Sequence, residues 1–476
     1  MDVPLYKQLA EGLADQIRHD VYKTGDKLPS VRGLAQKRSV SVSTVVMSYN
    51  LLEDWGMVEV RPKSGYYIKA SALHTLNLPK LKQSTAAPKP VTSSQLVMDV
   101  MRDSSNPEYI SLGAAIPDSN FPIIAQLKKT FAHMVRSQEF LGVGYGSTKG
   151  NETLRRQLAR RSVDSGVFVD PDELVITAGC QGAIGLCLRA LCKPGDIVAV
   201  ESPSYYGLLQ LVESLGLKVL EIPSDPETGM SVAALKLALE QWPIKAVLSV
   251  PTYSNPLGAL ISDADKKRMV ELINEYELPF IEDDIYGDLG YGEHRPKAVK
   301  AFDTEGRVLL CSSVSKVLEP QLGLGWVIPG RYLDAIEYER FLSSSSYFRL
   351  PQIALAEILS KGSFDRHIRI ARETYKQRRD RLVDLVGQYF PERTRMSQPQ
   401  GGFVAWLQLP ASVNAVQLYH DAKERGVIIA PGAIFSSNPN KYKSSIRLSY
   451  ANEWTREREQ AVQMIGALAH EQMVNS

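Results

Sequence analysis

Short apolar segments alternate with helical stretches through the middle of the chain, and this alternation limits the possible fold more than any other feature. The strand candidates are residues 173–177, 196–200, 218–222, 245–250, 279–284 and 307–311. Buried strands that are separated by helices form βαβ units, so the sequence predicts an α/β body with a mostly parallel sheet. After residue 330 the pattern is mainly helical, with strand candidates at 401–409 and 444–450, which predicts a smaller α+β lobe.

Polar residues and glycines follow four of these strand candidates. They are Gly179-Cys180-Gln181-Gly182, the segment 251–258 (PTYSNPLG), Asp283-Asp284-Ile285-Tyr286, and the segment 312–316 (SSVSK). Ligands of open α/β sheets bind beyond the carboxyl ends of the strands, so this placement predicts one shared site. A glycine-rich turn that opens a helix can hold a phosphate, but it is commonly just a turn. Asp283 could likewise only cap a helix, and Lys316 could be a surface lysine.

The first 70 residues have a different pattern, in which three helical segments precede a hairpin. The first helix, expected over 4–21, carries an apolar residue at every fourth position: Leu5, Leu9, Leu13, Ile17 and Val21. Two further helices are expected after the caps Ser30 and Ser41. The buried stripe of the last helix is Val45, Tyr49 and Leu52. Segments 57–61 and 66–69 flank a Pro-Lys-Ser-Gly turn, which predicts the hairpin.

This order of elements is that of a winged helix-turn-helix, which places its last helix in the DNA major groove and its wing on the backbone or in the minor groove. The residues positioned to reach DNA are Arg32, Ser41, Ser43, Thr44, Arg61, Lys63 and Gly65. A three-helix protein-interaction module or a dimerisation arm has the same pattern and stays open as an alternative.

Residues 71–95 separate these two regions and differ from both in composition. They contain three Pro and three Lys with many Ser and Thr, and they contain no acid, so we predict a flexible, partly extended linker. The expected domains are a DNA-binding domain at 2–70, the linker at 71–95 and a body at 96–473. Within the body, we expect a large lobe at about 110–330 and a small lobe at about 331–473.

Composition excludes several classes of protein. Of the 476 residues, 44% are hydrophobic and 23% charged, which is typical of globular chains and not of disordered ones. The net charge of +2 gives no nucleic-acid signature, although a binding domain can keep its basic surface local. The four cysteines form no CxxC pair, so we expect no metal site and a reducing compartment. No secretion signal and no membrane-spanning stretch is evident, and we expect a cytoplasmic protein.

The motifs together resemble known families. Residues 100–470 resemble a fold-type I, pyridoxal phosphate (PLP)-dependent aminotransferase through YGSTKGNETLR (145–155), TAGCQGA (177–183), ESPSYYG (201–207), NPLG (255–258), EDDIYGDL (282–289), SSVSK (312–316) and IRLSY (446–450). Residues 4–69 resemble the GntR winged-helix family through PLYKQLA, LPSVRGLA and SGYYI. The whole chain is similar to the MocR group of GntR-type regulators, which join these two parts.

The aminotransferase resemblance implies a role for each site residue. Lys316 would hold PLP covalently, Asp283 would pair with the pyridine nitrogen, and Tyr286 and Asn255 would bond the phenolate oxygen. The remaining cofactor contacts would be Cys180, Gln181, Ser313 and Ser315 at the phosphate and Tyr205 on the ring. Arg447, together with Asn255, would bind a substrate carboxylate. Tyr145 matches a tyrosine that reaches into the neighbouring subunit's site, which implies a homodimer.

Two positions depart from the family patterns. Gly323 stands where the aminotransferases carry a phosphate-binding arginine, and Gln321 replaces a glycine just before it. The lost contact is a charge-assisted hydrogen bond, worth roughly 1.5–3 kcal/mol. In the last N-terminal helix, Val42 stands where GntR relatives often carry arginine, so base recognition is expected to depend on Ser43 and Thr44.

The resemblance favours a transcription regulator that binds double-stranded operator DNA and senses PLP or an amino compound through its aminotransferase-like body. One alternative is a working PLP-dependent aminotransferase, although we expect at most weak transaminase activity. A second alternative is a regulator that has lost PLP, because Gly323 weakens the phosphate site.

Overall fold

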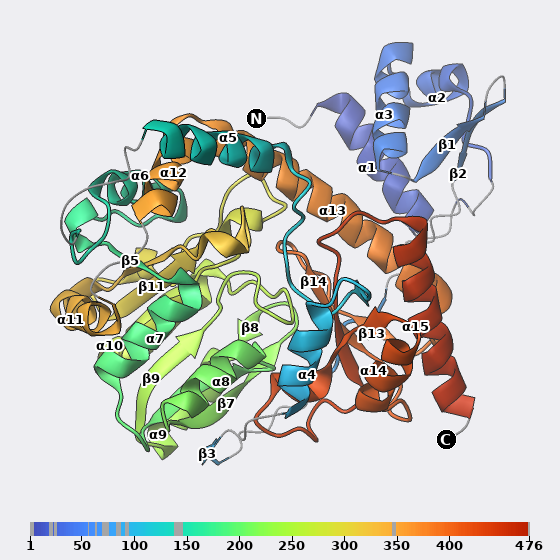
Figure 1. The fold of residues 1–476 in the computed structure, drawn as a ribbon. Coiled ribbons are helices and arrows are strands. Elements are labelled where there is room, and N and C mark those ends of the chain that lie inside the picture. Colours follow the sequence, from blue (N-terminus) through green and yellow to red (C-terminus); the bar gives the residue numbers. More distant parts are fainter. Residues whose placement is uncertain are drawn as a thin grey trace. The chain divides into compact units, whose positions relative to one another are not determined.

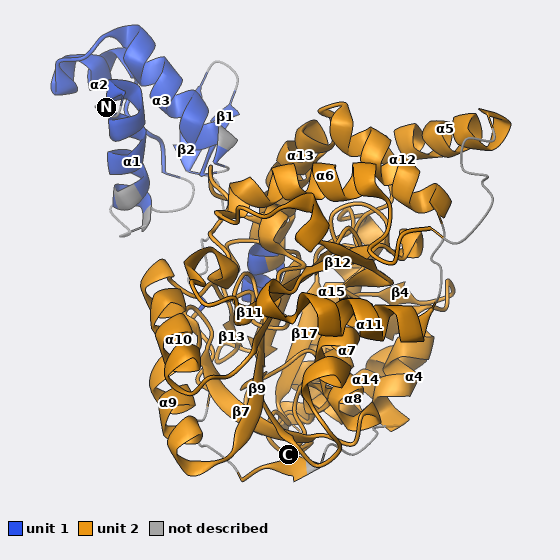
Figure 2. Cartoon of the chain, turned by 90° about the vertical axis from the view of Figure 1, so that its left-hand side faces the viewer, with its two compact units in different colours: residues 1–76, 383–388 blue, residues 77–382, 389–476 orange. Residues whose placement is uncertain are grey.

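The computed structural model describes residues 4–18, 22, 26–55, 57–61, 64–68, 76–81, 87–90, 95–137, 146–344 and 349–474. The chain divides into two compact units, one of residues 1–76 with 383–388 and one of residues 77–382 with 389–476 (Figure 2). Hydrophobic clusters of buried residues lie within the N-terminal unit and, separately, within the second unit.

The N-terminal unit consists of three helices and a hairpin. Its elements are α1 (Leu5–Arg18), α2 (Val31–Arg38), α3 (Val42–Asp54), β1 (Val58–Arg61) and β2 (Gly65–Ile68), and β1 pairs antiparallel with β2 (Figure 1). The predicted caps are confirmed, because the Ser30 hydroxyl accepts from the Gly33 N–H at 3.1 Å and the Ser41 hydroxyl accepts from the Thr44 N–H at 3.0 Å. This unit therefore has the predicted winged helix-turn-helix order.

The core of this unit confirms one predicted stripe fully and the other in part. Val45, Tyr49 and Leu52 of α3 are fully buried, as predicted. On α1 the predicted Leu13 is buried, and Leu9 and Ile17 pack against the core, whereas Leu5 is 56% exposed and Val21 lies outside the described residues. A four-residue step advances the side chain by about 40° more than one turn, so Leu5 at the start of the helix has turned away from the core, and Ala10 and Ala14 complete the buried face.

A nine-stranded sheet forms the centre of the large lobe in the second unit. Its order is β3-β7-β6-β9-β10-β11-β12-β5, with β8 beside β7. The strands are β3 (Lys89–Pro90), β5 (Val175–Thr177), β6 (Ile197–Ser202), β7 (Lys218–Asp225), β8 (Gly229–Met230), β9 (Ile244–Ser249), β10 (Phe280–Asp283), β11 (Val308–Ser313) and β12 (Gly325–Ile328). The five neighbouring strands β7, β6, β9, β10 and β11 run parallel, which confirms the predicted sheet. The antiparallel β12 between β11 and β5 was not predicted.

Helices cover both faces of this sheet (Figure 1). The helices α7 (Gly179–Leu191) and α8 (Tyr206–Ser214) share a core with one face, and α9 (Val232–Gln241) and α10 (Asp263–Glu275) share a core with the other. Successive residues of β6 alternate between the two cores, with Val198 in the first and Ala199 in the second. Because both faces are buried, the strands appear in the sequence as continuous apolar runs.

The small lobe combines helices with an antiparallel sheet, as predicted. The sheet has the order β13-β14-β17-β16, with β13 (Arg395–Met396), β14 (Val404–Gln408), β16 (Ala430–Pro431) and β17 (Ser445–Ser449). The short strands β4 (Ile110–Ser111) and β15 (Val427–Ile428) pair in parallel. The helices of the second unit not yet named are α4 (Gln95–Ser104), α5 (Pro122–Ser137), α6 (Glu152–Ser162), α11 (Leu333–Ser343), α12 (Arg349–Ser360), α13 (Ser363–Tyr389), α14 (Ala415–Glu424) and α15 (Arg456–Val474).

Parts of the segment predicted as a linker are bonded to both lobes. The side-chain amide of Gln408 accepts from the Lys80 N–H at 2.7 Å and donates to the Lys80 carbonyl at 3.2 Å. The Met396 N–H donates to the Asn77 carbonyl at 3.0 Å. Further along the chain, β3 is the edge strand of the large sheet and pairs with β7. Residues 77–80 are thus fixed to the small lobe and residues 89–90 to the large lobe.

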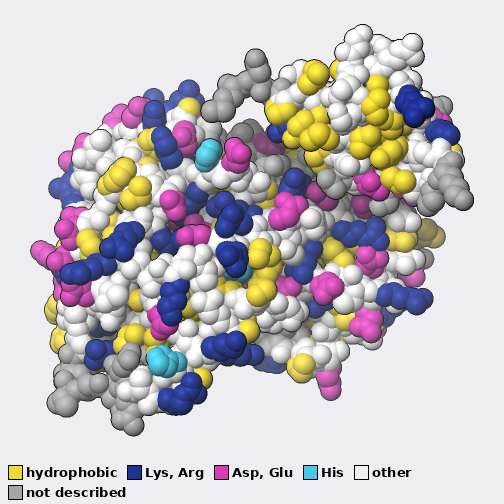
Figure 3. Space-filling model, turned by 90° about the horizontal axis from the view of Figure 1, so that it is seen from above, with side chains coloured by type: hydrophobic (Ala, Val, Ile, Leu, Met, Phe, Trp, Pro, Cys, Tyr) yellow, Lys and Arg dark blue, Asp and Glu magenta, His cyan; other side chains and the backbone are white. Residues whose placement is uncertain are grey.

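Charged side chains of both signs are interspersed over the face drawn in Figure 3, in agreement with the small net charge. All four cysteines are free thiols. Within the described ranges, no helix combines the length and the apolar content that crossing a membrane requires.

Tyr49 anchors the N-terminal unit and provides a test of its core. The Tyr49 hydroxyl donates to the Pro29 carbonyl at 2.8 Å, and its ring centroid lies 4.7 Å from that of Tyr66. We expect Tyr49→Ala to destabilise this unit by about 3–5 kcal/mol, because a buried ring is removed. Tyr49→Phe should cost only about 1 kcal/mol, because the ring stays and one hydrogen bond is lost.

Hydrogen–deuterium exchange of the full-length protein would measure this difference in α2 and α3. Tyr49→Ala should lose most of the amide protection there, and Tyr49→Phe should keep most of it. Unchanged protection in Tyr49→Ala would show that this side chain does not anchor the unit.

Candidate functional site

The carboxyl ends of the parallel strands β6, β9, β10 and β11 lie side by side, and they form what we call the carboxyl edge of the large sheet. Asp283 is the last residue of β10 and pairs with Cys311 of β11. Lys316 follows the end of β11 by three residues, and Asn255 follows the end of β9 by six. Arg447 belongs to β17 of the small lobe and contacts Asn255. The residues predicted from four separate motifs therefore meet at one place.

The Asp283 carboxylate is buried at this edge, and Lys316 is half-buried there. Oδ1 of Asp283 accepts from the Cys180 thiol at 3.2 Å and from the Ile285 N–H at 3.1 Å. Burial raises the pKa of Asp283 to about 6. Nζ of Lys316 donates to the Ala115 carbonyl at 2.7 Å. Burial, together with repulsion from Arg447, lowers the pKa of Lys316 to about 8, so a much larger fraction of this amine is neutral near pH 7 than in an ordinary lysine.

The guanidinium of Arg447 is fully buried but only partly paired. Nη1 donates to Oδ1 of Asn255 at 2.9 Å, and Nη2 donates to the Gly113 carbonyl. Nε has no hydrogen-bond partner among the described residues. The rings of Phe435 and Tyr206 lie 5.1 and 5.9 Å from the guanidinium carbon. A buried guanidinium that has only neutral acceptors and aromatic neighbours is suited to bind a carboxylate.

Tyr286 adds a buried hydroxyl without a partner. Its side chain is 2% exposed, and no described group forms a hydrogen bond with the hydroxyl. An unpaired buried hydroxyl costs free energy, so this position fits a ligand that brings an acceptor. The predicted stacking residue, Tyr205, packs on Tyr206 with ring centroids 4.6 Å apart. Gly207 makes room for the Tyr205 ring, because a Cβ at 207 would lie only 2.5 Å from it.

The start of α7 offers N–H groups to an anion. Ala178 occupies the N-cap position and provides no side-chain cap. Gly325 of β12 lies against this turn, where a Cβ would come within 2.4 Å of the Gly179 carbonyl carbon. Gly325 also pairs with Ser313 of β11, whose hydroxyl donates to the Ser315 hydroxyl at 2.9 Å. The predicted phosphate contacts Cys180, Gln181, Ser313 and Ser315 are therefore neighbours around an uncapped helix N-terminus.

Gly323 leaves this region without the side chain that the family resemblance leads one to expect. It is exposed, has φ of +60°, and ends the short 3₁₀ helix Pro320–Leu322. No atom lies within 4 Å of where its Cβ would be, so a larger side chain has space. The left-handed φ makes any other residue strained here, which gives a local reason for glycine.

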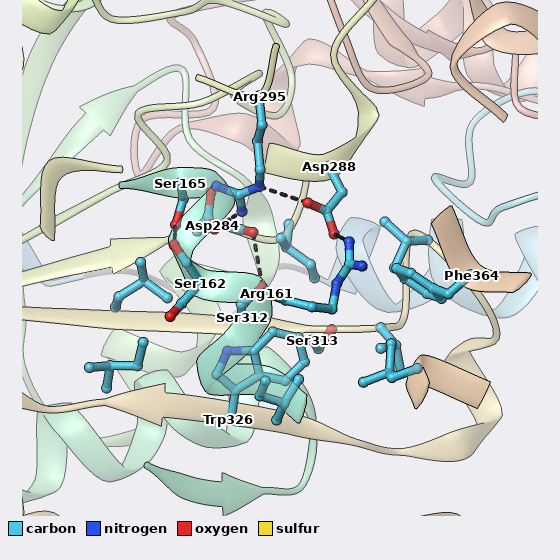
Figure 4. Close-up of a pocket in the computed structure, with 17 residues that line it drawn as sticks. Arg161, Ser162, Ser165, Asp284, Asp288, Arg295, Ser312, Ser313, Trp326 and Phe364 are labelled. Atoms are coloured by element: carbon cyan, nitrogen blue, oxygen red, sulfur yellow. Dashed lines mark hydrogen bonds and ion pairs between the residues drawn. The ribbon is translucent and has the colours of Figure 1, made fainter. Parts of the chain in front are cut away.

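Sequence reasoning missed a buried ion-pair network beside this edge (Figure 4). Arg295 contacts the carboxylates of Asp284 and Asp288, with Nε of Arg295 2.7 Å from Oδ1 of Asp288. Arg161 lies 3.4 Å from Asp288 and 2.5 Å from Asp365. The adjoining cavity holds only about 40 Å³, which is room for about one water molecule. Arg295 and Arg161 lie 11 and 123 positions from Asp284 and belong to none of the motifs recognised in the sequence, so sequence reasoning did not find them.

The residues predicted to reach DNA lie at the surface of the N-terminal unit. Arg32 lies at the start of α2, and Ser41, Ser43 and the half-buried Thr44 lie at the start of α3. In the hairpin, the Arg61 guanidinium carbon lies 4.4 Å from the centroid of the Tyr67 ring, and its Nε donates to Glu59 at 2.8 Å. Gly65 has φ of +119°, a conformation that favours glycine.

Two predicted residues, Lys63 and Tyr145, fall outside the described residues. Across the described part of the chain, no group of three or more His, Cys, Asp and Glu side chains is placed to hold a metal ion.

Solved aminotransferases share the fold of the second unit. A kynurenine aminotransferase from Pyrococcus horikoshii in complex with PMP has a TM-score of 0.73 and 27% sequence identity, and the match covers 80% of this chain and 95% of that one. LysN, an α-aminoadipate aminotransferase from Thermus thermophilus complexed with N-(5'-phosphopyridoxyl)-L-leucine, has a TM-score of 0.74 and 25% identity, with coverage of 81% and 97%. Aminotransferases of this fold are PLP-dependent.

Family models and full-length relatives cover both units. Residues 109–465 match the model "Aminotransferase class I and II", and residues 5–68 match "Bacterial regulatory proteins, gntR family". The HTH-type transcriptional regulators YjiR and YdcR of Escherichia coli (strain K12) are 38% and 34% identical to this chain, and each match covers 98% of this chain and 99% of the relative. The chain therefore belongs to the MocR-like transcription regulators, which join a GntR-type helix-turn-helix DNA-binding domain to a class I and II aminotransferase body.

Proposed function

We propose that this DNA-binding regulator holds PLP at the carboxyl edge of its large sheet and changes its DNA affinity when an amino compound joins the cofactor there. The observation that carries the proposal is the convergence of Lys316, Asp283 and Arg447 with the unpartnered hydroxyl of Tyr286. The aminotransferases that were solved with PMP and with a phosphopyridoxyl-leucine adduct support this ligand class.

The residues at this edge fit PLP. Lys316 would hold its aldehyde carbon, Asp283 would keep its pyridine nitrogen protonated, and Tyr286 and Asn255 would bond its phenolate oxygen. The phosphate and ring contacts would come from Cys180, Gln181, Ser313, Ser315 and Tyr205. When bound, PLP withdraws electrons from the carbon next to an attached amine. The low pKa of Lys316 suits its part, because the neutral amine is the nucleophile.

Arg447 would select ligands that carry a carboxylate. Its present acceptors, Asn255 and the Gly113 carbonyl, are neutral, and a carboxylate is a stronger partner for a buried guanidinium. Because Arg447 lies in the small lobe and Lys316 in the large lobe, an amino acid bound to both would favour one arrangement of the lobes. A ligand shifts such an equilibrium only through its different affinity for the two states.

We also propose that the protein is a homodimer in the cytoplasm. The helix α11 exposes Tyr338, Phe341 and Leu342 by 62, 51 and 58%, and large exposed apolar side chains that lie together favour a protein interface. A regulator that binds chromosomal DNA acts in the cytoplasm of a bacterium.

The competing function is transamination, and the same residues favour it. Lys316, Asp283 and Arg447 would all take part in the exchange of an amino group. Gly323 argues against efficient turnover, because the cofactor must stay bound through a stage in which Lys316 does not hold it, and no arginine at 323 holds the phosphate.

The assignment of Lys316 predicts a covalent attachment. Protein mixed with PLP and reduced with borohydride should retain PLP on the polypeptide, and Lys316→Ala should lose this fixation. Lys267→Ala, which removes an exposed lysine of α10, is the matched control and should behave as wild type. Mass spectrometry of the reduced protein would measure the PLP that is covalently attached to the polypeptide. PLP trapped on the Lys316→Ala chain would show that another lysine is used.

The depressed pKa of Lys316 predicts a pH dependence. The rate at which the apoprotein captures PLP should rise with pH and level off above about pH 8, because only the neutral amine reacts. A lysine with an ordinary pKa of about 10.4 would give a rate that still rises at about pH 9. Stopped-flow absorbance across this pH range would separate the two. Arg447→Gln should move this profile to higher pH, since the guanidinium repels the ammonium form.

The role of Arg447 predicts which ligands affect DNA binding. With PLP present, an effective amino acid should change the affinity for a selected operator by about five- to 100-fold. The matched amine without the carboxylate should change the DNA affinity much less. In the Arg447→Gln protein, the amino acid and the amine should change the DNA affinity by the same amount. Fluorescence anisotropy with labelled DNA would measure these affinities. Rapid steady-state transamination with DNA affinity that is indifferent to PLP and amino acids would favour the enzyme instead.

A further inference from the structure

The helix α3 presents an apolar surface where a DNA-reading helix usually presents polar side chains. Val42 is 50% exposed, and Val46, one turn later on the same face, is half-buried, while Met47 is 50% exposed on a neighbouring face. The opposite face of α3 packs in the core through Val45, Tyr49, Leu52 and the buried Ser48. The exposed apolar side chains are therefore left over after the core has been filled.

The polar groups at the start of α3 are engaged with one another. The Ser41 hydroxyl lies 2.8 Å from the Ser43 hydroxyl and 2.7 Å from the Thr44 hydroxyl, and it also caps the Thr44 N–H. The helix Val42–Asp54 contains no lysine or arginine. It therefore lacks the side chains that bind guanine most often, and the hydroxyls of its first turn each have a hydrogen-bond partner in the N-cap residue Ser41.

The basic side chains of the N-terminal unit lie outside α3. Among the residues that the structure describes, the exposed ones are Lys7, Lys27, Arg32, Lys37, Arg38 and Arg61. On the face drawn in Figure 3, hydrophobic side chains of the N-terminal unit reach the surface beside Lys and Arg side chains. On α3 itself, the exposed acid Glu53 lies near the end opposite Val42. These cations suit contacts with DNA phosphates and leave base contacts at the start of α3 to uncharged side chains.

We propose that Val42 recognises the 5-methyl group of a thymine in the major groove, with Val46, one turn further along α3, extending the apolar contact. The inference rests on DNA binding by this unit and goes beyond it by naming the base. Among the four bases, thymine alone presents a methyl group in the major groove, and apolar side chains are its complement. Residues at the N-terminal end of a recognition helix contact the base edges, and Val42 is the first residue of α3.

In this proposal, affinity for DNA and discrimination between bases come from different side chains. Affinity comes from the basic side chains outside α3, through phosphate contacts that are independent of sequence and sensitive to salt. Base discrimination at the start of α3 comes from burial of apolar surface, so it should change little with salt. Ser43 and Thr44 stay predicted DNA contacts, although each of their hydroxyls already has one hydrogen-bond partner in Ser41.

The test removes methyl groups from both partners, one from the thymine and two from Val42. An operator is first obtained by in vitro selection with the full-length protein, and each thymine in it is then replaced singly by deoxyuridine, which lacks only the methyl group. We expect one thymine in each half-site to weaken wild-type binding by about fourfold when replaced, the value of one buried methyl group. With Val42→Ala, the same replacement should have no effect.

Controls separate this inference from the function proposed above. Leu5→Ala removes an exposed apolar side chain from α1 of the same unit and should keep the full deoxyuridine effect. Val42→Ala should leave the thermal unfolding of the protein unchanged, because Val42 is exposed and alanine favours helix. An operator that tolerates deoxyuridine everywhere, or an effect that persists in Val42→Ala, would overturn the inference while DNA binding stands. Selection that enriches no sequence would instead overturn specific DNA binding and this inference with it.

Discussion

The buried guanidinium of Arg447 joins the two lobes, and the candidate site depends on it. It lies on the small-lobe strand β17, yet its partners are Asn255 at the large-lobe edge and the carbonyl of Gly113. A second buried charge also links the lobes. Glu221 of β7 accepts from Lys441 at 2.8 Å and from the Ser436 hydroxyl at 2.7 Å. Buried charges are costly unless paired, so these contacts define how the lobes meet.

The balance of charge at the site explains why it is suited to an anionic ligand. The half-buried Lys316 and the fully buried Arg447 share the edge with the carboxylate of Asp283, and the pKa of Lys316 falls because desolvation and Arg447 both oppose its charge. A ligand carboxylate on Arg447 would relieve this repulsion. The predicted phosphate contacts at residues 179–181 and 313–315 are neutral donors, so the α7 terminus supplies most of the favourable potential there.

Site residues could be predicted from the sequence where they directly follow the ends of parallel strands. They could not be predicted where their role depends on contacts between residues that no local pattern connects. Asp283, Lys316 and Asn255 could be named because parallel strands end at one edge, and Arg447 because it stands in a family motif. The ion pairs of Arg295 with Asp284 and of Lys441 with Glu221 join residues 11 and 220 positions apart, and no local pattern encodes them. The exposed Leu5 was misjudged because a four-residue repeat approximates the helical period poorly.

The proposed sensing requires a physical connection between the site and the chain that leads to the DNA-binding unit. The segment Asn77–Lys80 is bonded to β13 and β14 of the small lobe, and β3 is paired with β7 of the large lobe. These two attachments move with different lobes, because one is made to each. Arg447 and Lys316 also belong to different lobes. A ligand held by both would therefore act on the position of one lobe relative to the other, and this position also sets the separation of the two attachments. The coupling therefore needs no contact between the ligand and the DNA-binding unit, only a small lobe whose position differs between the free and liganded states.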